Sequence, residues 1–153
     1  AIRCVLRGQE IALTEPGFRR DFVFIEDVVE ACLLASTAEK AIGEIINVGS
    51  GAQWSNEEVV EMVQVLAGRR VPVNVGAYPA RPSDTGCWVA DIGAAKDKLG
   101  WAPRYGLRTG LQKTIAWFRQ HAAVYDAFDR AASAGNWSGR SGHAGEAGGR
   151  GGK

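Results

Sequence analysis

The stretch that decides the fold reads Arg81-Pro-Ser-Asp84, then Trp88-Val-Ala-Asp91, then Lys98-Leu-Gly-Trp-Ala-Pro103. The proline after Arg81 keeps that arginine extended, so its guanidinium can point away from the local backbone. Asp91 is suited to cap the first turn of a helix, and Gly100 is suited to end that helix. The stretch therefore predicts a loop and a short extended segment that lead into one helix.

Strands and helices alternate on both sides of this stretch. Runs of β-branched and aromatic residues predict strands, and apolar residues at helical spacing predict helices. Glu26 or Asp27 is expected to cap the helix that ends near Glu39, and Ser55 with Glu58 has the spacing of a capping box. The predicted strands are 10–14, 20–25, 44–48 and 71–75, and the predicted helices are 26–39, 56–66, 91–99 and 107–131.

The segment Ile45-Ile46-Asn47-Val48 predicts more than a local strand. A nearly continuous apolar run is typical of a strand buried on both faces of a parallel sheet. The 153 residues supply too few strand–helix–strand units to build such a sheet. We therefore expect either a missing N-terminal domain or a homo-oligomer to provide the packing, because exposed apolar surface of this size normally marks an interface.

The composition is that of a soluble globular domain, with 46% apolar residues, 23% charged residues and a net charge of +1. This charge argues against nucleic acid as a partner, and no apolar run is long enough for a membrane helix. Three scattered cysteines without metal-ligand spacing favour a reducing, cytoplasmic location. Residues 134–153 are rich in glycine and poor in apolar mass, so we expect a disordered tail after an ordered body at 1–133.

Five motifs in order carry a resemblance to a known family: Arg20-Asp21-Phe22, Asn47-Val-Gly-Ser-Gly51 and the three segments quoted first. Over about residues 1–120 the chain resembles the C-terminal half of an NAD-dependent nucleotide-sugar epimerase or dehydratase of the extended short-chain dehydrogenase/reductase family. Its Arg-Pro-Ser-Asp segment is most similar to the 4-epimerase type. The resemblance implies an α/β fold, a fragment of an extended Rossmann-type fold with the last sheet elements and the small mixed α/β substrate-binding domain.

The resemblance also implies a substrate site for a UDP- or dTDP-linked sugar. Arg20 and Arg81 would bind the diphosphate, Asp84 would meet the ribose, and backbone groups of Ala12 would meet the nucleobase. A guanidinium suits a diphosphate because its fixed fork of donors matches two phosphate oxygens. Taken alone, the Arg-Pro-Ser-Asp segment favours a surface turn with an internal ion pair, and the surrounding motifs reverse that preference. Arg19 is expected to face solvent.

Two functional hypotheses follow. In the first, the chain is the nucleotide-sugar-binding portion of an NAD-dependent epimerase or dehydratase, whose NAD loop and catalytic tyrosine and lysine come from sequence that is absent here. In the second, it is a stand-alone, non-catalytic relic or oligomerisation module with the same fold. Tyr78, Tyr105 and Tyr125 are followed four residues on by Pro, Thr and Asp, so no Tyr-x-x-x-Lys pair occurs. No catalytic residue, cofactor-binding residue or metal ligand is predicted in these 153 residues.

Overall fold

The structure is a computed structural model that describes residues 1–79 and 85–133. Its helices and strands belong to two units, Ala1–Gln120 and a second unit that begins at His121. Two of the predicted site residues, Arg81 and Asp84, and the predicted tail at 134–153 lie outside the described residues.

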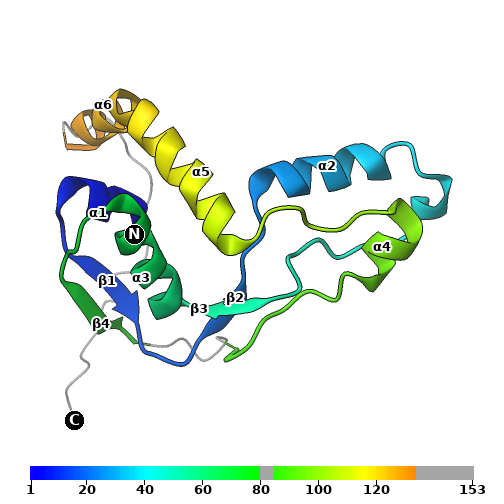
Figure 1. Ribbon diagram of the computed structural model, residues 1–153, viewed down its shortest axis with the longest axis horizontal. Coiled ribbons are helices and arrows are strands. Elements are labelled where there is room, and N and C mark those ends of the chain that lie inside the picture. The colour runs from blue at the N-terminus through cyan, green and yellow to red at the C-terminus, as the bar shows by residue number, and fades with distance from the viewer. Residues whose placement is uncertain (80–84, 134–153) are drawn as a thin grey trace, which may run out of the picture. The chain divides into compact units, whose positions relative to one another are not determined.

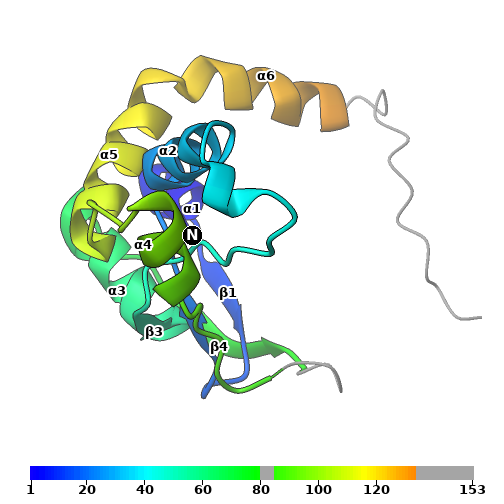
Figure 2. The same cartoon turned by 90° about the vertical axis from the view of Figure 1, so that its right-hand side faces the viewer.

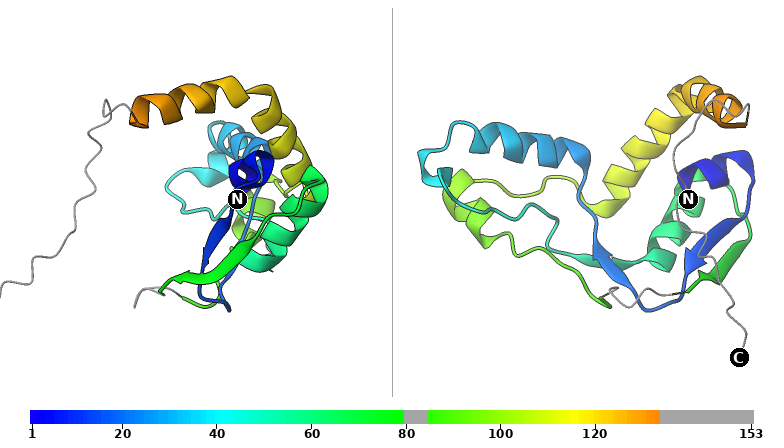
Figure 3. Two further views of the ribbon diagram at one scale, coloured as in Figure 1. Left: turned by 90° about the vertical axis from the view of Figure 1, so that its left-hand side faces the viewer. Right: turned by 180° about the vertical axis from the view of Figure 1, so that it is seen from behind.

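The first unit contains two small sheets (Figure 1). Strand β1 (Ile11–Thr14) pairs in parallel with β4 (Val73–Tyr78), and the two lie side by side in Figures 1 and 3. Strand β2 (Arg19–Asp21) pairs antiparallel with β3 (Gln53–Ser55). A parallel bridge between Arg19 and Cys87 adds the segment around Cys87 to β2. The second sheet is therefore assembled from three parts of the chain that are far apart in sequence.

Helices α1 (Ile2–Arg7), α3 (Asn56–Ala67) and α5 (Leu107–Gln120) surround the first core. Each contributes a buried aliphatic side chain, and β1 adds another from the sheet. Helix α3 starts where the sequence predicts, because the Ser55 and Glu58 side chains form both hydrogen bonds of a capping box. The buried aliphatic residues of this core are Val5, Ile11, Val60, Val63 and Ile115.

Helices α2 (Ile25–Ala35) and α4 (Gly93–Leu99) lie side by side over the second core (Figures 1 and 2). Its centre is Trp101, which is 2% exposed, between Ala31 and Ala95. The Trp101 indole donates a hydrogen bond to the backbone carbonyl of Asp27 at 3.0 Å. Trp101 thus packs in this core, and the predicted helix end at Gly100, which has a φ of 65°, is confirmed.

Asp27 has a different role from the predicted helix cap. Phe24 occupies the N-cap position of α2, and Asp27 lies in the first turn of the helix with no solvent exposure. Its carboxylate accepts hydrogen bonds from the backbone N–H groups of Arg104 and Tyr105, both at 3.1 Å. Asp27 thus ties the segment after α4 to α2, because a buried carboxylate needs hydrogen-bond donors.

Several predicted boundaries were wrong. Helix α2 ends at Ala35, and a short 3₁₀ turn, η1 (Glu39–Ala41), follows. The predicted helix at 107–131 is two helices, α5 and α6 (Ala122–Ser133), separated by His121. The predicted strand at 44–48 pairs with no strand among the described residues. Trp88, which follows the bridge at Cys87, is 66% exposed in this chain.

Candidate functional site

The site is organised around Asp21, the last residue of β2. Its Oδ1 accepts hydrogen bonds from the backbone N–H and the hydroxyl of Ser50. Its Oδ2 accepts from the N–H of Gly51 at 3.0 Å and from the N–H of Ala90 at 3.2 Å. One carboxylate therefore holds the turn after residue 48 and the segment before α4 against β2.

These contacts set the charge state of Asp21. Burial works to raise the pKa of this carboxyl, but the hydrogen bonds from Ser50, Ala90 and Gly51 together outweigh it and lower the pKa below its ordinary value of 3.8. Asp21 is therefore ionised at neutral pH. Its negative charge is compensated by donated N–H and O–H groups.

Residue 49 must be a glycine, because the segments around Asp21, Gly49 and Ala90 approach one another closely. A Cβ atom on this residue would lie 2.5 Å from the Cβ of Ala90 and 2.6 Å from Oδ2 of Asp21, distances too short for any side chain. The glycine therefore lets three backbone segments meet at one point. Gly51 completes the tight turn, with a left-handed φ of 71°.

Arg20 precedes Asp21 and points to another part of the site. Its Nη1 donates to the backbone carbonyl of Thr85 at 2.8 Å and to that of Arg19 at 2.9 Å. The guanidinium carbon lies 5.4 Å from the centre of the Phe18 ring, within the range of a cation–π contact. No described residue accepts from its Nε or Nη2, so these donors are available to a ligand.

A cavity of about 230 Å³ adjoins Arg20. It combines one guanidinium with the indole of Trp88 and small or aliphatic groups beside them. Such a surface can bind an anion through Arg20 while an attached ring rests against the exposed indole. The residues that line the cavity are Arg20, Asp21, Val23, Val48, Gly49, Trp88 and Ala90.

Arg20, a predicted site residue, lines this cavity. For the other predicted site residues, Ala12, Arg81 and Asp84, the outcome is different. Ala12 is exposed on β1, opposite Asn74 of β4, and is not part of the cavity lining. Arg81 and Asp84 lie outside the described residues. Thr85, whose carbonyl binds Arg20, is the first described residue after them.

Arg19 does not simply face solvent, as the sequence predicted. Its guanidinium donates to the carbonyl of Gln53 at 3.1 Å and lies 3.2 Å from the Glu58 carboxylate, and 41% of its side chain is exposed. Arg19 and Arg20 therefore point to different partners. The alternation of side chains along β2 explains the difference, because consecutive residues of a strand face opposite sides.

Sequence analysis missed Asp21 and Trp88 as members of the site. Asp21 lies within a quoted motif, but nothing local indicates that it binds residues 29 and 69 positions away. Trp88 lies four residues after Asp84, and this proximity to the Arg-Pro-Ser-Asp segment was the available signal.

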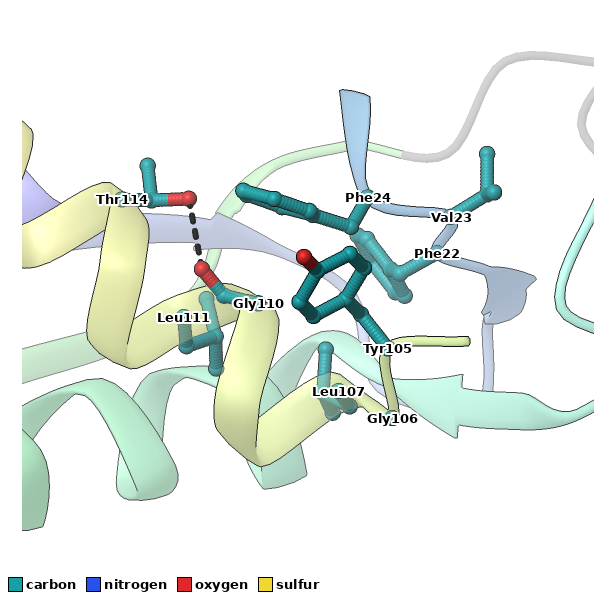
Figure 4. Close-up of a pocket in the computed structure, with 9 residues that line it drawn as sticks. All are labelled: Phe22, Val23, Phe24, Tyr105, Gly106, Leu107, Gly110, Leu111 and Thr114. Carbon is teal, nitrogen blue, oxygen red and sulfur yellow. Dashed lines mark hydrogen bonds between the residues drawn. The ribbon is translucent and has the colours of Figure 1, made fainter. Parts of the chain in front are cut away.

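A second cavity, of about 120 Å³, lies at the start of α5 (Figure 4). Phe24 and Tyr105 meet edge to face on one side, with ring centres 4.9 Å apart. Lys113 lies near both rings, but its Nζ is held by both oxygens of Glu26 at 2.8 Å. In Figure 4 the Thr114 hydroxyl donates to the carbonyl of Gly110, so the polar groups here are satisfied internally. This cavity is small and apolar, and it does not suit a diphosphate.

The described residues do not fit a dinucleotide cofactor. The glycine-rich turn Asn47–Gly51 leads into β3, and its Ser50 and Gly51 N–H groups already donate to Asp21. The pyrophosphate of a dinucleotide needs such N–H groups as its own donors. Within residues 1–79 and 85–133 no cluster of His, Cys, Asp and Glu could hold a metal ion. The same residues include no helix with the length and apolar character needed to cross a membrane.

Comparison with known proteins finds relatives along most of the chain. The family model described as GDP-mannose 4,6 dehydratase matches residues 3–114. A UDP-glucose 4-epimerase from Streptomyces lividans is 33% identical over 108 residues, which cover 70% of this chain and 32% of that protein.

Solved structures of related enzymes are also similar to this chain. A UDP-glucose 4-epimerase from Thermotoga maritima, determined with UDP-glucose, is 30% identical with a TM-score of 0.72, over 79% of this chain and 38% of that one. MoeE5, determined with UDP-glucuronic acid and NAD, is 34% identical with a TM-score of 0.69, over 78% of this chain and 40% of that one. The predicted fold, part of a Rossmann-type epimerase, is confirmed, and the chain spans between 32% and 40% of these relatives.

Proposed function

Because the chain belongs to the family of GDP-mannose 4,6-dehydratase and related NAD-dependent epimerases and dehydratases, we propose that it forms the nucleotide-sugar-binding portion of such an enzyme. In this function the chain holds the diphosphate of a UDP- or dTDP-linked sugar. The reacting sugar then meets NAD and a catalytic Tyr/Lys pair that lie in sequence beyond these 153 residues. NAD is the cofactor of this family, since relatives were solved with it bound.

The placement of Arg20 is the observation that carries the proposal. Its guanidinium lines the 230 Å³ cavity and keeps Nε and Nη2 available, while Nη1 is anchored to Thr85 and Arg19. An arginine held in this way is oriented before the anion arrives, which reduces the conformational entropy lost on binding. Trp88 adds an exposed aromatic surface beside it.

Three further residues complete the proposed site. Arg81 is proposed to bind the same diphosphate as Arg20, and Asp84 to accept hydrogen bonds from the ribose hydroxyls. Backbone groups of Ala12 are proposed to meet the nucleobase. The Arg20–Thr85 hydrogen bond supports this assignment, because it holds the residue directly after Asp84 at the arginine.

Calorimetric titration of the purified chain with UDP tests the proposal. We expect measurable binding, and Arg20→Ala or Arg81→Ala should weaken it by ~1.5–3 kcal/mol, roughly 10- to 150-fold, the value of a hydrogen bond to a charged group. Arg81→Lys should not fully restore the affinity, because an ammonium cannot make the two-pronged contact.

Arg70→Ala is the matched control, since Arg70 is an exposed arginine that pairs with Glu61 on α3 and does not line the cavity. Its UDP affinity should equal that of the unmodified chain. Equal affinities for the unmodified chain, Arg20→Ala and Arg81→Ala would end the site assignment.

A further inference from the structure

Among the residues that the structure describes, the Arg20 guanidinium is held only by neutral groups. Its Nη1 donates to the carbonyls of Arg19 and Thr85, and its Cζ lies 5.4 Å from the centre of the Phe18 ring. Arg19 differs, because its own guanidinium lies 3.2 Å from the Glu58 carboxylate. A carboxylate neutralises the cation that it binds, whereas a carbonyl or an aromatic face does not. Arg20 therefore keeps its positive charge at the cavity that it lines.

The contact between Phe18 and Arg20 is built into a fixed part of the backbone. Gly17 has a left-handed φ of 99°, and the turn at this residue leads the chain towards β2. Residues two apart in an extended segment project to the same side, so Phe18 and Arg20 share one face. Between them, the N–H and C=O groups of Arg19 are both hydrogen-bonded to the segment 86–88, at 2.7 and 3.1 Å.

An aromatic ring restrains a guanidinium without using its N–H groups, because the ring attracts the charge and accepts no conventional hydrogen bond. The two hydrogen bonds at Nη1 hold one end of the Arg20 group and leave Nε and Nη2 for an anion. Phe18 restrains the same group through its ring. Phe18 is partly buried and does not line the cavity, so it acts on a bound anion through Arg20.

We propose that Phe18 is a positioning residue, whose ring holds the Arg20 guanidinium in the orientation that receives the diphosphate. This inference rests on the proposed function, since the diphosphate is the anion which that function assigns to Arg20. A guanidinium that is already oriented loses less conformational freedom when the anion binds. A cation–π contact at an exposed site corresponds to a change of about two- to fivefold in an equilibrium constant.

The first test is calorimetric titration of the purified chain with UDP. Phe18→Leu removes the aromatic face but keeps an apolar side chain, and we expect it to weaken UDP binding about two- to fivefold. Phe18→Tyr keeps the ring and should bind UDP as the unmodified chain does. In an Arg20→Ala background, Phe18→Leu should weaken binding no further, because Phe18 acts through Arg20. A merely structural role would weaken binding in both backgrounds.

The second test needs no ligand. Nitrogen-15 exchange NMR measures how fast the Arg20 guanidinium rotates about its Cζ–Nε bond, and this rotation must break the contacts that hold the group. We expect rotation about two- to fivefold faster in Phe18→Leu and unchanged in Phe18→Tyr. Phe24→Leu is the matched control, because the Phe24 ring also lies 5.4 Å from a cation, the Nζ of Lys113, but does not line the 230 Å³ cavity. It should change neither the Arg20 rotation nor the UDP affinity.

Unchanged rotation in Phe18→Leu, or equal effects of Phe18→Leu and Phe24→Leu, would overturn the positioning role. A further loss of UDP affinity from Phe18→Leu in the Arg20→Ala background would overturn it as well. Faster rotation in Phe18→Leu, in a chain that does not bind UDP, would support the restraint of Arg20 and contradict the proposed function. The two failures are therefore distinguishable.

Discussion

Arg20 and Asp21 are adjacent in sequence, but their side chains make different contacts at the candidate site. Asp21 uses both carboxylate oxygens to hold Ser50, Gly51 and Ala90 in place, and it faces inward. Arg20 uses one terminal nitrogen for anchoring and keeps its other donors for the cavity. A structural carboxylate therefore lies next to a guanidinium proposed to bind the ligand, and Asp21 holds together the segments that line the cavity.

The lowered pKa of Asp21 predicts how stability depends on pH. A carboxyl whose pKa is lower in the folded than in the unfolded state stabilises the fold above its unfolded pKa, and this contribution is lost as pH falls through the folded pKa. The chain should therefore lose stability below about pH 4, since the ordinary pKa is 3.8 and the folded pKa lies beneath it. Urea unfolding measured from pH 6 to pH 2.5 gives this dependence.

Asp21→Asn is the diagnostic variant. It should be less stable at pH 6 by ~1–3 kcal/mol, because some N–H and O–H donors lose their charged acceptor. It should also lose less stability than the unmodified chain on acidification. An Asp97→Asn control, on the exposed surface of α4, should leave the pH profile unchanged. Identical profiles for the unmodified chain and Asp21→Asn would contradict the assignment.

At the scale of elements, helix starts differ in how far local sequence determines them. Helix α3 starts at a reciprocal capping box whose two residues are three positions apart. Helix α2 starts after Phe24 with no side-chain cap, and its acidic residues serve tertiary contacts with Arg104, Tyr105 and Lys113. The first kind of signal can be recognised from sequence, and the second depends on the rest of the fold.

The α3 cap gives a prediction for a single substitution. Ser55→Ala should destabilise the chain by ~1 kcal/mol, because the N–H of Glu58 loses its hydrogen-bond acceptor at the helix start. Ser36→Ala is the control, since the exposed Ser36 hydroxyl only contacts the carbonyl of Leu33 at the end of α2. Chemical denaturation of both variants measures the difference. An equal effect of the two substitutions would show that the capping box contributes nothing.

At the scale of the whole molecule, the described residues form a cavity beside Arg20, proposed to bind substrate, and include no site for the cofactor. The N–H groups of the glycine-rich turn already donate hydrogen bonds to Asp21, and no tyrosine is followed by a lysine four residues on. Hydride transfer needs a bound nicotinamide and a group that moves the hydroxyl proton. We therefore propose that turnover requires further sequence that supplies both.

We expect the 153-residue chain to bind NAD no more tightly than an unrelated protein does, and to leave UDP-glucose unchanged in the presence of added NAD. NADH fluorescence titration measures binding, and chromatography of the sugar nucleotides measures turnover. The full-length epimerase from Thermotoga maritima serves as the positive control. Turnover that follows the purified chain through several columns would refute the expectation.

The sequence by itself determined the family, most element positions and the candidate role of Arg20. These signals are local in sequence: the five motifs in order, the capping box and the glycines each depend on neighbouring residues. They can therefore be recognised from the sequence alone. Only the tertiary structure decided that the buried Asp27 accepts hydrogen bonds from the segment after α4. It alone decided that Asp21 accepts hydrogen bonds from the N–H groups of the glycine-rich turn. It also decided that Ile45–Val48 pairs with no other strand among the described residues. These outcomes depend on partners tens of residues away, because hydrogen bonding and burial are settled only when distant segments meet.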